Sequence, residues 1–328
     1  MKRIIAALLA ACLLPCAALA SEARDASGVT ETDGRLRGDI VGTGAEGGQL
    51  ALRVDCPLPA DFAPEQRAVL TTEWIETDEA AVGEAVRATG ADWHDADLER
   101  LAPAFVSGEA EPLPAGADAE GAAKRACAAA QRFLRSCGLG EGSVLHILRP
   151  EDEARLDAFN VIPDAREAYI RRVLAEWFTP RLDYTWVQLA FTLRGLTVSP
   201  CVWRGADGVS RSSVANLYIG DAGEMRTFIL AYAPREISAQ GYAGALKEPL
   251  EALVELSEGF DCALASPRED ERGRELPAQW PVALDIRPAY HSDDGVTFYP
   301  AWLVTLAWQD ADGLTGRSWL ASVDARKP

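Results

Sequence analysis

Residues 282–323, near the C-terminus, contain three runs in which apolar and polar residues alternate with a period of two, and this pattern most constrains the fold. Successive side chains of a strand point to opposite faces of a sheet, so each alternating run predicts a strand with one buried face. Residues 292–295 and 309–313 separate the runs and are rich in Asp and Gly, which tolerate the positive φ of hairpin turns. The region therefore predicts three antiparallel strands: Val282–Tyr290, Trp302–Trp308 and Trp319–Val323.

Helices are predicted where apolar residues recur at helical spacing between capping residues. Asp78 and Asp164 are expected N-caps, and Gly138 is the expected left-handed stop of a helix over 122–137. The predicted helices cover residues 78–90, 122–137, 164–178 and 249–259. Strands are expected at 49–55, 68–76 and 185–193, and residues 225–232 suit a central strand because they are almost continuously apolar. The predicted class is α+β, with antiparallel sheets and helices packed on one side.

The N-terminus has the pattern of a secretory signal peptide. Lys2 and Arg3 precede an apolar run over residues 4–14, and Ala18-Leu19-Ala20 supplies the cleavage pattern. We expect cleavage before Ser21 and an exported chain at the cell surface or outside the cell. A lipid anchor at Cys16 is the alternative, although Pro15 stands where a small residue usually precedes a modified cysteine. No segment of the mature chain is expected to span a membrane.

Composition along the chain predicts two modules. Residues 21–47 are rich in Gly, Asp, Glu and Thr and predict a flexible tether after the signal peptide of residues 1–20. The Gly-, Pro- and Ala-rich segment 107–121 predicts a linker. It separates an N-terminal β/α module, residues 48–106, from a C-terminal α+β module, residues 122–328.

The charge balance excludes one class of partner. The chain has 32 basic and 50 acidic residues and a formal charge of −18, which becomes −20 without Lys2 and Arg3. Nucleic-acid binding needs clustered Lys and Arg against phosphates, so no nucleic-acid partner is expected.

Five cysteines remain after removal of the signal peptide, so at least one thiol is unpaired. Cys127 and Cys137 lie about 15 Å apart on one predicted helix, too far to bridge. Cys201 and Cys262 are the candidate disulfide, although fifteen arrangements of two bridges among five cysteines stay open.

Sequence motifs do not predict a catalytic, cofactor or metal site. Gly42–Gly47 matches G-x-G-x-x-G but lacks a preceding strand and a following helix. Gly208–Ser212 resembles a nucleophile elbow without its final glycine. His94, His146 and His291 have no metal-ligand spacing, and the acidic cluster around His94 suits a solvated helix start.

One aromatic pair is a candidate contact for a partner. Trp203 and Arg204 follow a predicted strand and stand before Gly205. An aromatic ring beside a cation suits partner contact, and a capped sheet edge is the equal alternative.

The order of several segments resembles a known group of proteins. An aromatic strand opens with Tyr184-Thr185-Trp186 and ends in Leu193–Leu196, and Glu224-Met225, Tyr299–Trp302 and Ala321–Ala325 follow. This order resembles secreted or lipid-anchored proteins of unknown function from Gram-positive gut bacteria, with a layout similar to YycH/YycI-type extracellular regulators of an envelope sensor kinase. The resemblance implies a non-catalytic envelope protein and supplies no site residues.

Two functional hypotheses follow. The first is an exported, non-catalytic envelope protein that binds an unknown protein or ligand at the cell surface, with regulation as one role. The alternative is a secreted hydrolase that uses His291 or His94 with nearby carboxylates.

Overall fold

The computed structural model describes residues 24–44, 47–89, 119–148, 184–205, 207–220, 222–230, 232–260, 268–269, 275–276, 278–311 and 313–327. The chain divides into two compact units. Unit 1 combines residues 1–70 and 239–328, and unit 2 comprises residues 71–238. The chain passes between the units in two strands, β5 (Ala68–Glu76) and β14 (Tyr232–Gly241), which pair with each other. The predicted module boundaries at 106 and 122 do not coincide with these units.

Unit 1 is built on a large mixed sheet whose strands follow the order β1-β3-β4-β17-β18. β2 pairs with β3, and β19 pairs with β18. β4 and β17 run parallel, so the prediction of purely antiparallel sheets is wrong at this pair. The strands are β1 (Arg24–Asp25), β2 (Thr30–Thr32), β3 (Arg35–Gly44), β4 (Gly47–Pro57), β17 (Trp280–His291), β18 (Thr297–Asp310) and β19 (Gly313–Asp324).

Smaller elements complete unit 1. The helix α6 (Pro249–Ser257) packs against β1 and β19 and confirms the helix predicted after Pro249. A single 3-10 turn, η2, covers Pro64–Gln66. The short strands β15 (Arg268–Glu269) and β16 (Glu275–Leu276) pair only with each other among the described strands.

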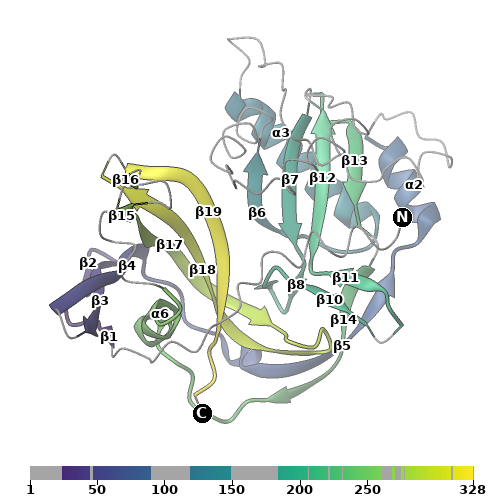
Figure 1. Ribbon diagram of the computed structural model, residues 1–328. Helices are drawn as coiled ribbons and strands as arrows, with labels where there is room; N and C mark the ends of the chain where they lie inside the picture. Colours follow the sequence, from purple (N-terminus) through teal and green to yellow (C-terminus); the bar gives the residue numbers. More distant parts are fainter. Residues whose placement is uncertain are drawn as a thin grey trace. The chain divides into compact units, whose positions relative to one another are not determined.

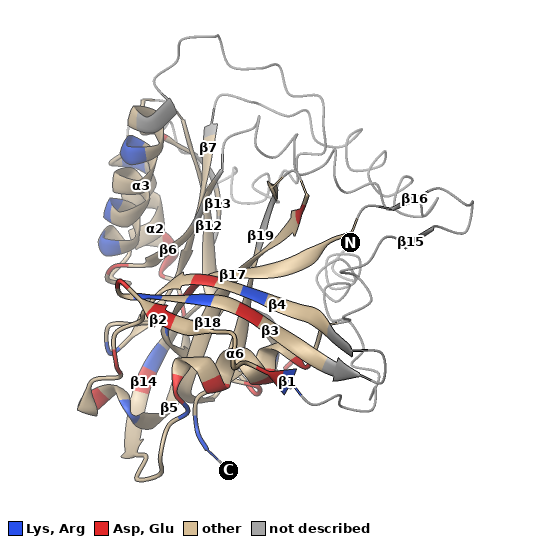
Figure 2. Ribbon diagram, turned by 90° about the vertical axis from the view of Figure 1, so that its left-hand side faces the viewer, with Lys and Arg blue, Asp and Glu red and all other residues tan. Residues whose placement is uncertain are grey.

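The segment predicted as a flexible tether forms β1 to β3 over its described residues, so that prediction is wrong there. Leu36 and Ile40 are buried, and the alternating residues on the other face are charged. Arg35 pairs with Asp55 across the β3–β4 hairpin. Figure 2 shows blue and red residues along these strands. Few apolar residues are needed when a strand buries one face, so composition alone suggested a tether.

The three predicted C-terminal strands are confirmed as β17, β18 and β19, which lie side by side (Figure 1). His291 pairs with Tyr299 across the first turn, where Gly295 has a φ of 74°. The Ser292 hydroxyl accepts a hydrogen bond of 2.8 Å from the Gly295 amide and closes the turn.

Unit 2 contains a four-stranded antiparallel sheet in the order β13-β12-β7-β6. The helices α2 (Glu79–Arg87) and α3 (Ala119–Ser136) share one core with this sheet, in which Phe133 contacts Phe228 with ring centroids 5.3 Å apart. Two short hairpins, β8–β9 and β10–β11, belong to the same unit. The strands are β6 (Ser143–Leu148), β7 (Tyr184–Ala190), β8 (Thr192–Leu193), β9 (Leu196–Val198), β10 (Val202–Arg204), β11 (Ser210–Ser212), β12 (Val214–Gly220) and β13 (Met225–Ile229).

Local signals placed the described helices of unit 2 correctly. The Asp78 carboxylate caps α2 by accepting a hydrogen bond from the Ala80 amide. The helix expected at 164–178 lies outside the described residues. Residues 225–232 do not form a central strand, because β13 is an edge strand whose apolar side chains pack against α3. The sheet-dominated structure agrees with the α+β prediction at the level of class. None of the described helices is both long and apolar enough to cross a bilayer.

Candidate functional site

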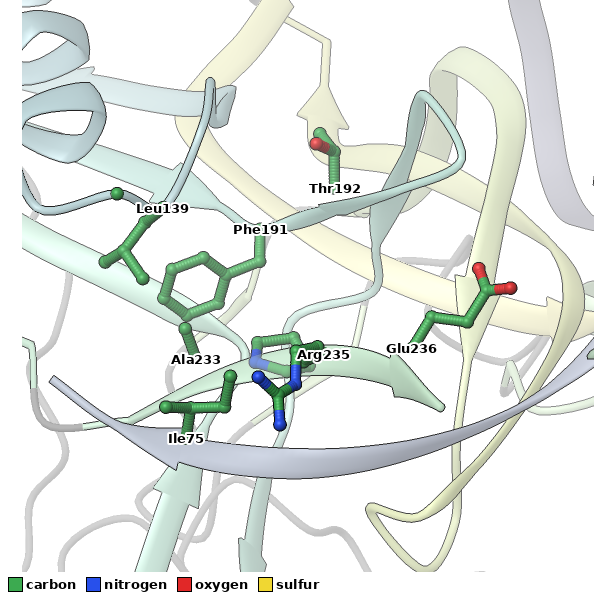
Figure 3. A pocket seen from close by; sticks show the side chains of 9 residues that line it. Ile75, Leu139, Phe191, Thr192, Ala233, Arg235 and Glu236 are labelled. Atoms are coloured by element: carbon green, nitrogen blue, oxygen red, sulfur yellow. The ribbon is translucent and has the colours of Figure 1, made fainter. Parts of the chain in front are cut away.

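Unit 2 contains a pocket of about 290 Å³. Figure 3 shows the Phe191 ring beside Leu139 and Ala233, with Ile75 on β5 and the Glu236 side chain directed away from this apolar group. The lining residues are Ile75, Gly138, Leu139, Phe191, Thr192, Ala233, Pro234, Arg235 and Glu236.

The end of α3 brings Leu139 to the pocket. Gly138 has a φ of 72°, which glycine adopts without a steric penalty. The Leu139 amide donates to the Leu134 carbonyl, and the Gly138 amide donates to the Arg135 carbonyl. These two bonds form a Schellman motif, which ends the helix and turns the chain toward the pocket. The predicted stop at Gly138 is therefore confirmed.

A hairpin with a two-residue loop lies at the polar rim of the pocket. Arg194 and Gly195 join β8 to β9 and have φ values of 49° and 77°, as a tight hairpin loop requires. The Arg194 guanidinium donates two hydrogen bonds, of 3.0 and 2.7 Å, to the two carboxylate oxygens of Glu236. The bond from Arg194 holds the pKa of Glu236 below its ordinary value.

A second ion pair joins the two strands at the pocket. Arg235 on β14 contacts Glu73 on β5. Ile75, two residues further along β5, is 38% exposed although it lines the pocket. The site thus combines an exposed apolar surface with two Arg–Glu pairs on its rim.

The composition of this pocket suits binding. Its polar lining includes the Thr192 hydroxyl and the Glu236 carboxylate, which is bound by Arg194. Apolar walls with a few oriented polar groups are the usual composition of a ligand pocket. The volume lies near the lower limit of such pockets, so it matches a small molecule or one or two side chains.

A separate polar cluster lies in unit 1 and contains His291, at the end of β17. The Ser322 Oγ lies 3.0 Å from His291 Nδ1, and Asp293 Oδ1 lies 3.4 Å from His291 Nε2. The Tyr299 hydroxyl donates a hydrogen bond of 2.7 Å to the other oxygen of Asp293. The β18 strand brings these residues together, since it pairs with β17 through Tyr299 and with β19 near Ser322.

Burial lowers the pKa of His291, and the carboxylates of Asp293 and Asp324 oppose this shift only in part. The imidazole is consequently neutral at pH 7. Burial also raises the pKa of Tyr299, and its bond to Asp293 acts in the same direction, so its hydroxyl stays a donor. No group of three or more His, Cys, Asp or Glu side chains among the described residues is arranged to hold a metal ion.

The two residues predicted as partner contacts, Trp203 and Arg204, differ in their exposure to solvent. Trp203 is buried and packs against Trp74 with ring centroids 5.4 Å apart, which fits the alternative of a capped sheet edge better than an exposed contact. The alternation of side chains along β10 turns Trp203 inward and leaves Arg204 exposed. Arg204 stays a predicted partner contact.

The other predicted residues are only partly described. Cys201 is half-buried, but Cys262 lies outside the described residues, so their disulfide stays a prediction. His94 also lies outside them, and His146 is on β6 of unit 2. Of the three histidines, His291 has a described cluster of partners.

The sequence analysis missed the pocket. One part of the pocket has a local signal in the sequence, the turn at Arg194-Gly195 between two leucines. A glycine between apolar residues is typical of a tight turn. Ile75, Glu236 and Ser322 carry no local signal, since their neighbours come from distant parts of the chain.

Comparisons with known proteins give a distant structural likeness. No protein-family model matches the chain. No curated protein matches it either. A solved structure of an uncharacterized protein from Eubacterium rectale ATCC 33656 is similar with a TM-score of 0.40 and 10% identity, over 84% of this chain and 89% of that one. The likeness to YycH/YycI-type regulators stays a prediction.

Proposed function

We propose that this chain is an exported binding protein of the cell envelope and that the pocket of unit 2 receives an apolar group of its ligand. The pocket carries the proposal, because Ile75 and Leu139 offer apolar surface that a ligand can cover beside the buried ring of Phe191. The Arg194–Glu236 pair places fixed charges at the rim, where they would orient a polar part of the same ligand. This site is non-catalytic, and a regulatory role like that of YycH/YycI-type proteins is compatible with it.

A charged substitution at Ile75 tests the proposal. The protein is first screened by ligand-observed NMR against a library of small apolar and amphipathic molecules. We expect Ile75→Asp to weaken the binding of a pocket ligand at least about tenfold, because one tenfold step corresponds to about 1.4 kcal/mol.

Leu58→Asp is the matched control, because Leu58 is 42% exposed, is as large as Ile75 and lies in unit 1. It should bind the same molecules as the wild type. Binding that survives Ile75→Asp, or that both variants lose equally, would refute the pocket as the site.

A further inference from the structure

We propose that Ser322 is a nucleophile and His291 its general base, in a second site that transfers acyl groups from small esters. The site lies in unit 1 and is independent of the binding proposed for unit 2. The hydrolase alternative named only His291 with nearby carboxylates. The structure adds the serine, which stands 31 residues away in the sequence.

The contacts define the tautomer of His291. The Asp293 carboxylate near Nε2 acts as a hydrogen-bond acceptor, so it favours the imidazole tautomer that carries its hydrogen on Nε2. Nδ1 then presents its lone pair to the Ser322 hydroxyl at 3.0 Å, which is within reach for proton abstraction. Asp293 is a positioning residue, and the bond from Tyr299 orients its second oxygen.

The cluster is accessible and in the required protonation state. The His291 side chain is 20% exposed, that of Asp293 is 81% exposed, and Ser322 is half-buried. Since burial lowers the pKa of His291, the imidazole is neutral near pH 7 and able to accept a proton.

The reaction has two balanced steps. Ser322 Oγ attacks the ester carbonyl and gives its proton to His291 Nδ1. The bond from the carbonyl carbon to the leaving oxygen breaks, and that oxygen takes the proton from His291 to leave as an alcohol. Water then attacks the acyl-serine ester with His291 again as base, which releases the acid and restores the hydroxyl.

Activated esters and phosphonates have good leaving groups, so their reactions depend less on stabilisation of a developing oxyanion than those of ordinary esters. We therefore expect the site to react with activated esters and phosphonates, and we expect an acyl-serine intermediate that accumulates because its hydrolysis is the slower step.

Covalent labelling tests the assignment on the full mature chain. The probe is a biotin-linked fluorophosphonate, in which Ser322 Oγ forms a bond to phosphorus and fluoride leaves with the serine proton. Tandem mass spectrometry of the labelled wild type should place the adduct on Ser322, a result that no folding defect can imitate. p-Nitrophenyl acetate should give a burst of about one nitrophenolate per chain.

The variants separate the roles. Ser322→Ala should lose the label, and His291→Gln should slow labelling at least tenfold, while Ser238→Ala at an exposed serine of unit 2 should label like the wild type. Asp293→Asn should slow labelling and Asp293→Glu should restore it. Thermal unfolding of each variant shows whether it is folded. An unlabelled wild type, a label on another residue, or unchanged labelling in His291→Gln would overturn the proposal.

Discussion

Single residues in this protein are held in unusual states by partners distant in the sequence. Arg194 keeps a left-handed backbone, with a φ of 49°, while its side chain binds Glu236. His291 stays neutral because the fold buries it beside Ser322 and Tyr299. The shifted pKa values of Glu236 and His291 make the stability of the fold depend on pH, with a sign that follows from the direction of each shift.

Glu236→Gln should reduce the acid sensitivity of the protein. The folded pKa of Glu236 lies below its unfolded value, so this carboxylate stabilises the fold above about pH 4.3 and loses that effect as pH falls through the folded pKa. At pH 6 the variant should be less stable by about 0.5–1 kcal/mol, since the pair is partly exposed. Urea unfolding at pH 6 and pH 3 measures this. The difference in stability between the two proteins should be smaller at pH 3 than at pH 6, and an equal difference at both pH values would contradict the assignment.

His291→Gln should flatten the pH dependence of stability below about pH 6.5, the ordinary pKa of histidine. Burial lowers the folded pKa, so between the folded pKa and pH 6.5 the unfolded chain binds more protons and stability falls as the pH falls. Asp293 and Asp324 face the ring and oppose this effect in part. Chemical unfolding at pH 7.5 and 5.5 tests it. A larger loss of stability on acidification in the variant would contradict neutral burial.

Among the elements, α3 links the core of unit 2 to its pocket. Its inner face presents Phe133 and Leu134 to the sheet, and its C-terminal turn carries Leu139 into the pocket wall. The exposed face carries charged residues, which Figure 2 shows along the helix. Stability and pocket shape should therefore depend on the same helix.

Phe133→Ala should destabilise unit 2 by about 3–5 kcal/mol, as large cavities in a core do. Phe133 is buried and contacts Phe228, so its removal leaves a void between α3 and β13. Arg132→Ala, on the exposed face of the same helix, should stay within about 0.5 kcal/mol of the wild type. Urea unfolding measures both. Equal losses in the two variants would show that α3 is not packed as described.

Along the sequence, unit 2 is inserted between the two segments that make up unit 1. This arrangement predicts that the two units unfold separately under denaturant, because each has its own core. Neither boundary coincides with a low-complexity segment, so composition along the chain does not reveal the division.

Hydrogen exchange with mass spectrometry should resolve the two units. Phe133→Ala should speed exchange in the strands of unit 2 first, and Tyr290→Ala, at a buried residue of unit 1, should do so in β17 and β18. Exchange that rises equally throughout the chain in both variants would instead indicate one cooperative unit.

Export through a signal peptide is a property of the whole chain. N-terminal sequencing of secreted material should begin at Ser21 if the signal peptide is cleaved as proposed. A lipid-modified Cys16 at the terminus would indicate anchoring, and a start at Met1 would refute export.

Local chemistry predicted the helices and the C-terminal strands. The cap at Asp78, the stop at Gly138 and the alternation in β17 to β19 act within a few residues, so they can be recognised without the fold. The same local reasoning gave a wrong prediction for β3, because the charged residues of its outer face are also typical of a tether. β3 is a strand because it pairs with β4, and that pairing is not visible within the segment itself.

The sequence by itself determined the α+β class, the acidic surface and the positions of these elements. Only the tertiary structure decided the division into units, the parallel pairing of β4 with β17, the pocket around Phe191 and the meeting of Ser322 with His291. Periodicity and caps reflect forces between near neighbours, whereas a site depends on which distant strands pair and in which register. The pairing of strands is decided when the apolar residues of the whole chain are buried together, so it cannot be recognised in any short segment.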